Sequence, residues 1–214
     1  SAVQSRSGGL SLSGSEQLIM SDAGRWQAKV MVAVRGESSN LALRAFLAQM
    51  SGRAGTVLVP KWEAYRPTDR NGRQLSQVHA AGYDHDQSAE GNIFNFDLSG
   101  LGQQVVTLAT AAAPAPAGST AIEVTTANIE GPRPGHYFGI GPRLYLSSQV
   151  WQEEVGSTLQ VRFWPRLRGD VPNGERIILD RPVCLMRFAT DEEGQEGLSR
   201  RGSGMVTFNM VEAI

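Results

Sequence analysis

The sequence predicts a mainly β protein that contains one α-helix and a small antiparallel β barrel or sandwich. The 24 glycines and 10 prolines among 214 residues exceed the share of about 12% that these two residue types usually have together, which indicates many turns. After residue 120, short segments of alternating apolar and polar side chains recur at even spacing, a pattern typical of antiparallel strands. One segment near residue 45 instead has the 3.6-residue apolar period of a helix.

The N-terminal part of the chain predicts a lead-in followed by a strand. Residues 1–15 are rich in serine and glycine, which is the composition of a flexible segment. Between Gly24 and Val34 an apolar residue occupies every second position. This segment therefore predicts a strand with one buried face.

The next segment predicts the helix and a second strand. The apolar positions share one helix face through their i, i+3, i+4 and i+7 spacing: Leu43, Phe46, Leu47 and Met50. Three small residues are expected to allow close packing against a sheet: Ala42, Ala45 and Ala48. Ser38 and Ser39 are candidate N-caps, and Gly52 occupies the place of a C-terminal cap. Residues 56–59, closed by Pro60, predict a strand, which gives a β–α–β order with a right-handed crossover if the strands are parallel.

Residues 62–102 lack a sustained apolar period and are interrupted by glycine, proline and asparagine. A long excursion of this kind tends to carry function or to become ordered by a partner. Trp62 and Tyr65 lie in it and are expected to be exposed contact residues. The Ala-Pro-Ala-Pro-Ala sequence within Ala109–Gly118 then predicts a stiff linker and a domain boundary.

A second β domain is predicted after this linker. Turns containing proline or glycine separate five short predicted strands: 121–125, 136–140, 143–150, 159–164 and 176–179. This spacing favours a small antiparallel barrel or sandwich. Two more strands are predicted at 183–189 and 205–212, on either side of a polar loop at 191–202.

The composition excludes several classes of function. The 20 basic and 21 acidic residues nearly balance, which argues against a protein whose main task is to bind nucleic acid. Cys184 is the only cysteine, so neither an intrachain disulfide framework nor a cysteine zinc cluster is expected. No stretch approaches the ~18 apolar residues of a membrane span, and residues 1–9 lack the apolar region of a signal peptide. We therefore expect a soluble protein made in the cytoplasm.

No arrangement of catalytic residues is apparent. The chain contains no P-loop, and the glycines of 135–141 flank a predicted strand rather than the start of a helix. Only three histidines are available for Ser–His–Asp catalysis, and no serine lies in a nucleophile elbow. Asp84 and Asp86 could share a divalent cation in a metal-dependent hydrolase, because alternate residues of an extended segment point the same way, but a solvated polar loop is favoured. We therefore expect no enzymatic activity, no cofactor and no metal site.

The tryptophans leave two possibilities open. Trp26, Trp151 and Trp164 are expected to anchor cores, because large aromatic side chains usually bury most of their surface. The alternative is that Trp151 or Trp164 stacks on sugar rings, as in a carbohydrate-binding module.

Three groups of motifs follow one another along most of residues 24–214. The first comprises Arg25-Trp26-Gln27-Ala28-Lys29-Val30-Met31-Val32, residues 42–47 and Ser51-Gly52-Arg53-Ala54-Gly55-Thr56-Val57. The second is Gly135-His136-Tyr137-Phe138-Gly139-Ile140-Gly141, followed by Leu144-Tyr145. The third comprises Phe163-Trp164-Pro165-Arg166-Leu167-Arg168, residues 181–187 and Thr207-Phe208-Asn209-Met210-Val211-Glu212-Ala213. This order resembles the minor tail proteins of long, flexible-tailed bacteriophages and gene-transfer agents, and within that group the distal tail protein of the baseplate.

The resemblance implies a structural virion protein that is not an enzyme. Its fold would be a β-rich, split-barrel-like belt domain with a flanking helix, at residues 1–104 and 181–214, and an outer β domain inserted at 105–180. Copies of the chain would form a ring, as a hexamer, that joins the tail tube protein to the baseplate hub or tip protein. The protein would be located in the virion tail after synthesis in the host cytoplasm.

The contact candidates are Trp62, Tyr65, Asp84 and Asp86. The alternative function is a carbohydrate-binding β module at 105–180 that contacts host surface glycans. Neither function requires nucleic-acid binding or a membrane span.

Overall fold

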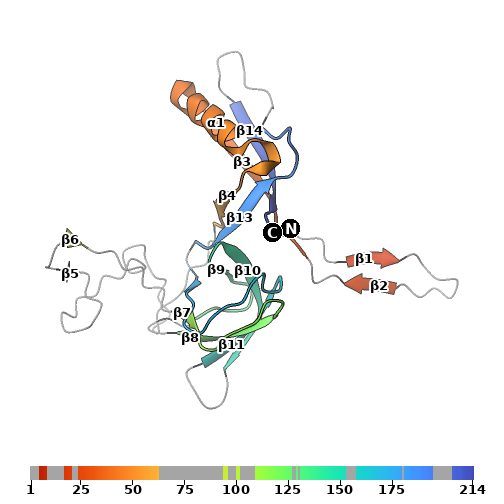
Figure 1. The fold of residues 1–214 in the computed structure, drawn as a ribbon, viewed down its shortest axis with the longest axis vertical. Coiled ribbons are helices and arrows are strands. Elements are labelled where there is room, and N and C mark those ends of the chain that lie inside the picture. Colours follow the sequence, from red (N-terminus) through yellow and green to blue (C-terminus); the bar gives the residue numbers. More distant parts are fainter. Residues whose placement is uncertain are drawn as a thin grey trace. The chain divides into compact units, whose positions relative to one another are not determined.

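A computed structural model describes the fold of the chain (Figure 1). The described residues are 5–8, 17–20, 24–62, 94–95, 100–101, 109–126, 129, 131–152, 158–179, 181–194 and 204–214. The protein is mainly β, as predicted, and the described residues contain one α-helix. The chain forms two compact units, Ser1–Val59 with Cys184–Ile214 and Pro60–Val183. The predicted domain boundaries, at 104/105 and 180/181, adjoin residues outside the described ranges.

The first unit is built on a four-stranded sheet in the order β3–β14–β13–β4. Its strands are β3 (Gln27–Val34), β4 (Val57–Pro60), β13 (Val183–Phe188) and β14 (Gly204–Glu212). All four were predicted, and β14 pairs antiparallel with both β3 and β13. The predicted β–α–β order is present along the chain, but β3 and β4 lie at opposite edges of the sheet because the two C-terminal strands pair between them.

Helix α1 (Gly36–Met50) begins earlier than predicted. Its N-cap is Arg35, which makes no side-chain cap. The predicted serine caps are wrong: Ser39 lies in the first turn, where its Oγ accepts a hydrogen bond from the Arg35 N–H at 2.7 Å. This bond closes the start of the helix from within the first turn. At the other end Ser51 adopts a left-handed φ of 47°, and Gly52 follows with a φ of +64° in the predicted C-terminal position.

The predicted apolar face of α1 packs on the sheet. Leu43 and Met50 are buried. The Phe46 ring meets Phe188 and Phe208 edge-on, with centroids 5.9 and 5.8 Å away. Phe188 and Phe208 stack on each other at 5.4 Å, so helix and sheet share one aromatic cluster. The expectation for the small residues is wrong, because these larger side chains make the contact and the small ones are exposed: Ala42, Ala45 and Ala48.

Two short hairpins complete the strands outside the main sheets. β1 (Ser5–Gly8) pairs antiparallel with β2 (Gln17–Met20). The predicted flexible lead-in is therefore wrong at Ser5–Gly8, because β2 supplies a pairing partner that serine and glycine content does not reveal. β5 (Phe94–Asn95) pairs in the same way with β6 (Gly100–Leu101).

The second unit contains a six-stranded antiparallel sheet that curls into a nearly closed barrel, as predicted. The strand order is β12–β9–β10–β11–β8–β7. The strands are β7 (Ala109–Ala111), β8 (Ala121–Thr126), β9 (Tyr137–Ile140), β10 (Arg143–Gln152), β11 (Thr158–Trp164) and β12 (Ile177–Ile178). A bridge between Thr110 and Arg176 brings the two edges of the sheet together. Inside, Phe138 stacks on Tyr145 at 5.5 Å and meets Phe163 edge-on at 5.5 Å.

The Ala-Pro segment belongs to this barrel, so the predicted linker is wrong. Its first residues form β7, and the Ala115 N–H donates to the Val171 carbonyl at 2.9 Å. The alanines are small enough to face the core and are buried, whereas the two prolines between them and after them are exposed: Ala109, Ala111 and Ala115 against Pro114 and Pro116. The segment with alternating alanine and proline therefore lies at the edge of the barrel sheet, where proline is tolerated.

Candidate functional site

Of the four predicted contact residues, Trp62 is the one that lies within the described ranges. It follows β4, and 73% of its surface is exposed, as predicted. The Arg181 guanidinium lies 5.6 Å from its ring centroid, within the range of a cation–π contact. Tyr65, Asp84 and Asp86 lie outside the described residues.

The backbone next to Trp62 is held against the barrel. The Lys61 N–H donates to the Pro182 carbonyl at 2.8 Å, and the Lys61 Nζ lies 4.6 Å from the centroid of the Tyr137 ring. Pro182 packs closely on Gly139, where an added Cβ would lie 3.3 Å from the Pro182 Cβ. Trp62 is therefore an exposed aromatic side chain on an anchored segment, which is the kind of residue that partners contact.

The four-stranded sheet has an exposed face opposite α1. Strand register places Met205 beside Ala33, and Thr207 beside Met31. These positions alternate with the buried Val206 and Phe208, so they point away from the helix. Met31 is 64% and Met205 57% exposed. We call this surface the outer sheet face and define it by Met31, Ala33 and Met205.

Both edges of this sheet lack a partner among the described strands. β3 pairs with β14 alone, and β4 lies beside β13 alone. Residues Met31, Val32 and Ala33 of β3 are all exposed, and so is Leu58 of β4. Edge strands are usually protected by charge, proline or covering segments, and Lys29 is the one charged residue of β3. An apolar edge of this kind is a ready template for pairing with another chain.

A buried carboxylate, that of Glu212, lies at the end of β14 and bonds to the residue that precedes β3. Glu212 is 1% exposed, and its Oε2 accepts a hydrogen bond from the Trp26 N–H at 3.2 Å. In return the Glu212 N–H donates to the Trp26 carbonyl at 2.8 Å. Trp26 is buried, as predicted. Sequence reasoning missed Glu212 because an acidic residue at the end of a strand usually faces solvent. The signal that could have found it is the alternation of β14, which places Glu212 on the same face as Val206, Phe208 and Met210.

The barrel carries two further features. Trp151 is 43% exposed on β10, so the prediction that it anchors a core is wrong, and Trp164 is half-buried. The inward positions next to Trp151 are occupied by Val150 of the same strand and by Val161.

A cavity of about 380 Å³ opens beside Tyr145, with Arg143, Arg168, Asp170 and Glu175 in its lining. Its two basic and two acidic residues balance, and Asp170 already accepts a hydrogen bond from the Ala117 N–H at 2.8 Å.

The remaining observations concern metal sites, membrane spans and similarity to known proteins. Within the described ranges, no three histidine, cysteine, aspartate or glutamate side chains gather as a metal site would require. No helix in the described part of the chain has the length and apolar character to cross a membrane. Comparison of the chain with models of known protein families and with curated protein sequences gave no match.

Proposed function

We propose that this protein is a structural subunit of a homo-oligomeric ring at the distal end of a long bacteriophage tail, where it joins the tail tube to the baseplate hub. The order of motifs along the chain motivates the tail assignment. The observation that carries the ring is the apolar edge and outer face of the four-stranded sheet, at Met31, Val32 and Met205. An assembly protein needs surfaces of this kind, because its subunits are stable only when neighbours cover them.

The two edges of the sheet favour a ring over an isologous dimer. β3 and β4 lie at opposite edges, so the β3 edge of one subunit and the β4 edge of the next form a heterologous pair. Repetition of such a contact closes into a ring when the rotation between subunits divides a full turn, and six copies correspond to the proposed hexamer. Backbone pairing would supply register, and Met31 and Leu58 would supply apolar contact at the same edges.

Two more features agree with assembly. The β1–β2 hairpin pairs with no other described strand, and an isolated two-stranded hairpin is marginally stable in water. A neighbouring subunit or the tail tube would supply the third strand or covering surface that such a hairpin requires. The nearly balanced 20 basic and 21 acidic residues limit repulsion between identical subunits packed side by side.

The test is the oligomeric state of the purified chain, measured by light scattering and by electron microscopy across a concentration series. We expect closed six-fold particles at high protein concentration. The double variant Met31→Glu/Met205→Glu should weaken assembly by tenfold or more, because burial of one methionine side chain contributes about 1.5–3 kcal/mol and each new charge must be desolvated.

The matched control is Leu41→Glu, which changes an equally exposed apolar residue, 56% exposed, on α1. It should assemble normally. A chain that stays monomeric at every concentration and binds neither tube nor hub protein would refute the proposed function.

A further inference from the structure

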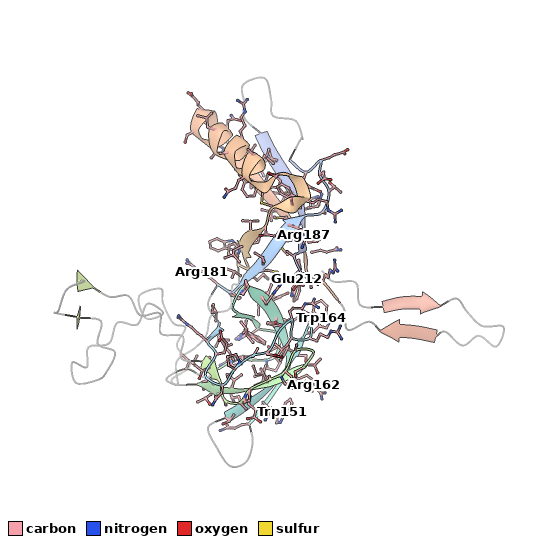
Figure 2. The ribbon with its side chains drawn as sticks, viewed as in Figure 1. Trp151, Arg162, Trp164, Arg181, Arg187 and Glu212 are labelled. Carbon is pink, nitrogen blue, oxygen red and sulfur yellow. The ribbon has the colours of Figure 1, made fainter. Side chains whose placement is uncertain are left out.

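The barrel unit carries Trp151, Arg162 and Trp164, which are labelled in Figure 2, and Trp151 belongs to a row of side chains that runs across three strands. Strand register places Trp151 of β10 directly beside Gln160 of β11, and Gln160 beside Glu123 of β8. The flanking residues Val161 and Ile122 are buried in the core. Because successive side chains of a strand alternate between faces, the three residues of the row share the outer face of the barrel.

A second row lies next to the first along the same strands. Gln149 pairs with Arg162, and Arg162 with Ala121. Between the two strands of this row, the Arg162 Nη1 donates to the Gln149 Oε1 at 3.4 Å. In the first row the Gln160 Nε2 donates to the Glu123 Oε1 at 2.9 Å. These hydrogen bonds orient the amide, carboxylate and guanidinium groups before any ligand arrives.

Trp164 marks the other end of this surface. It lies on β11, four positions beyond Gln160 and on the same face. Four strand positions correspond to about 13 Å, with the Gln149–Arg162 row between the two levels. Trp164 is half-buried against the sheet. We call the whole surface the tryptophan strip and define it by Trp151, Gln160, Glu123, Gln149, Arg162 and Trp164.

We propose that the tryptophan strip is a binding site for a neutral oligosaccharide. A pyranose ring has an apolar C–H face that packs on an exposed indole, and a rim of hydroxyls that need hydrogen-bond partners. Trp151 supplies the indole platform. Gln160, on the adjacent strand, and Glu123, one strand further, supply donors and acceptors in the same row. Planar groups with two donors or acceptors each suit adjacent hydroxyls on a sugar ring.

The charges of the strip favour an uncharged sugar. Glu123 and Arg162 are its only two charged groups and have opposite sign, so their fields largely cancel for an incoming anion. The two tryptophan levels about 13 Å apart favour an extended oligosaccharide over a single sugar. This proposal does not rest on ring assembly, since every residue of the strip belongs to the barrel unit, Pro60–Val183.

The experiment measures binding of oligosaccharides to the full chain by calorimetry and by tryptophan fluorescence. The probes are maltotriose, a β-linked galactose oligosaccharide, chitotriose and a trigalacturonate. We expect binding of at least one neutral probe. The variant Trp151→Ala should weaken that binding by about tenfold or more, as truncation of a central tryptophan in a binding site usually does.

Trp62→Ala is the matched control, because it removes an even more exposed tryptophan of the same unit that lies outside the strip. It should leave binding unchanged. Gln160→Ala is a second variant, and it should weaken binding without altering the circular dichroism spectrum.

Four binding results would overturn the proposal. They are failure of all neutral probes to bind, binding that Trp151→Ala leaves intact, binding that Trp62→Ala abolishes equally, and stronger binding of the trigalacturonate than of the neutral probes. If Trp151→Ala instead dissociates an oligomer without affecting sugars, the strip is a contact between copies of the chain and the proposal is wrong. A variant that loses sugar binding but assembles normally, or one that binds sugar but does not assemble, shows that sugar binding and ring formation are tested independently.

Discussion

Substitution of Gly55 by alanine should destabilise the first unit, because the added methyl group would overlap the backbone of Met50. Gly55 follows the end of α1, and its N–H donates to the Met50 carbonyl at 2.7 Å. A Cβ added to Gly55 would lie 2.4 Å from the Met50 carbonyl oxygen and 2.6 Å from the Met50 Cα. Both contacts are to backbone atoms, which cannot rotate away. The backbone of Gly55 has a φ of −74°, which alanine adopts without strain.

The size of the effect follows from these contacts. Forced repacking of a close contact costs about 1–3 kcal/mol, and loss of the Gly55–Met50 hydrogen bond costs a further ~1 kcal/mol. Against this, replacing glycine by alanine stabilises by about 0.4–1 kcal/mol through the unfolded state. The net expectation is a loss of about 1–4 kcal/mol in the free energy of unfolding of the first unit.

Urea unfolding followed by circular dichroism at 222 nm is a suitable assay, because α1 belongs to the first unit. The midpoint of Gly55→Ala should fall while the slope stays the same. Gly169→Ala is the control, since a Cβ there meets nothing within 4 Å and its φ lies outside the left-handed region. Equal midpoints for Gly55→Ala and the unmodified protein would refute the reasoning.

Two further predictions concern the buried side chains of the first unit. Phe188→Ala should lower its unfolding free energy by about 3–5 kcal/mol, because Phe188 is 1% exposed and packs on both Phe46 and Phe208; a loss below 1 kcal/mol in urea unfolding would contradict the aromatic cluster. Cys184 is a free cysteine and 2% exposed, so a soluble disulfide reagent should label it at least a hundredfold more slowly in the folded protein than in urea, given that reactivity requires an accessible thiolate. Fast labelling of the folded protein would show that β13 is not packed as described.

Residues outside the barrel show where sequence patterns predict function and where they do not. The exposure of Trp62 was predicted from the irregular sequence around it, but its contacts with the Arg181 side chain depend on a residue more than a hundred positions away. The outer sheet face was not predicted. Met31 of β3 and Met205 of β14 lie on adjacent strands, on the face of the sheet that would normally carry polar residues. Their exposure is recognised only once the structure shows that α1 covers the opposite face.

The tryptophan strip could not be predicted from the sequence either. The sequence left Trp151 open as either a core anchor or a sugar platform, because an isolated tryptophan is compatible with both. The pairing of β10 with β11 decided only that Trp151 is exposed, since Val150 and Val161 meet inside the barrel and Trp151 and Gln160 are left outside. Register between strands depends on which segments pair, and a local period carries no information about that.

By itself, the sequence determined the class of the fold, the positions of the four strands of the first unit's sheet and of five of the six barrel strands, and the apolar face of α1. These follow from local periodicity, because a strand or helix must place its apolar residues on one side whatever it packs against. Tertiary structure decided the order of strands, the hydrogen bond between Glu212 and Trp26, the role of the Ala-Pro segment as a barrel edge and the exposure of Trp151. Each of these depends on contacts between segments far apart in the chain, whose free energy no local pattern contains.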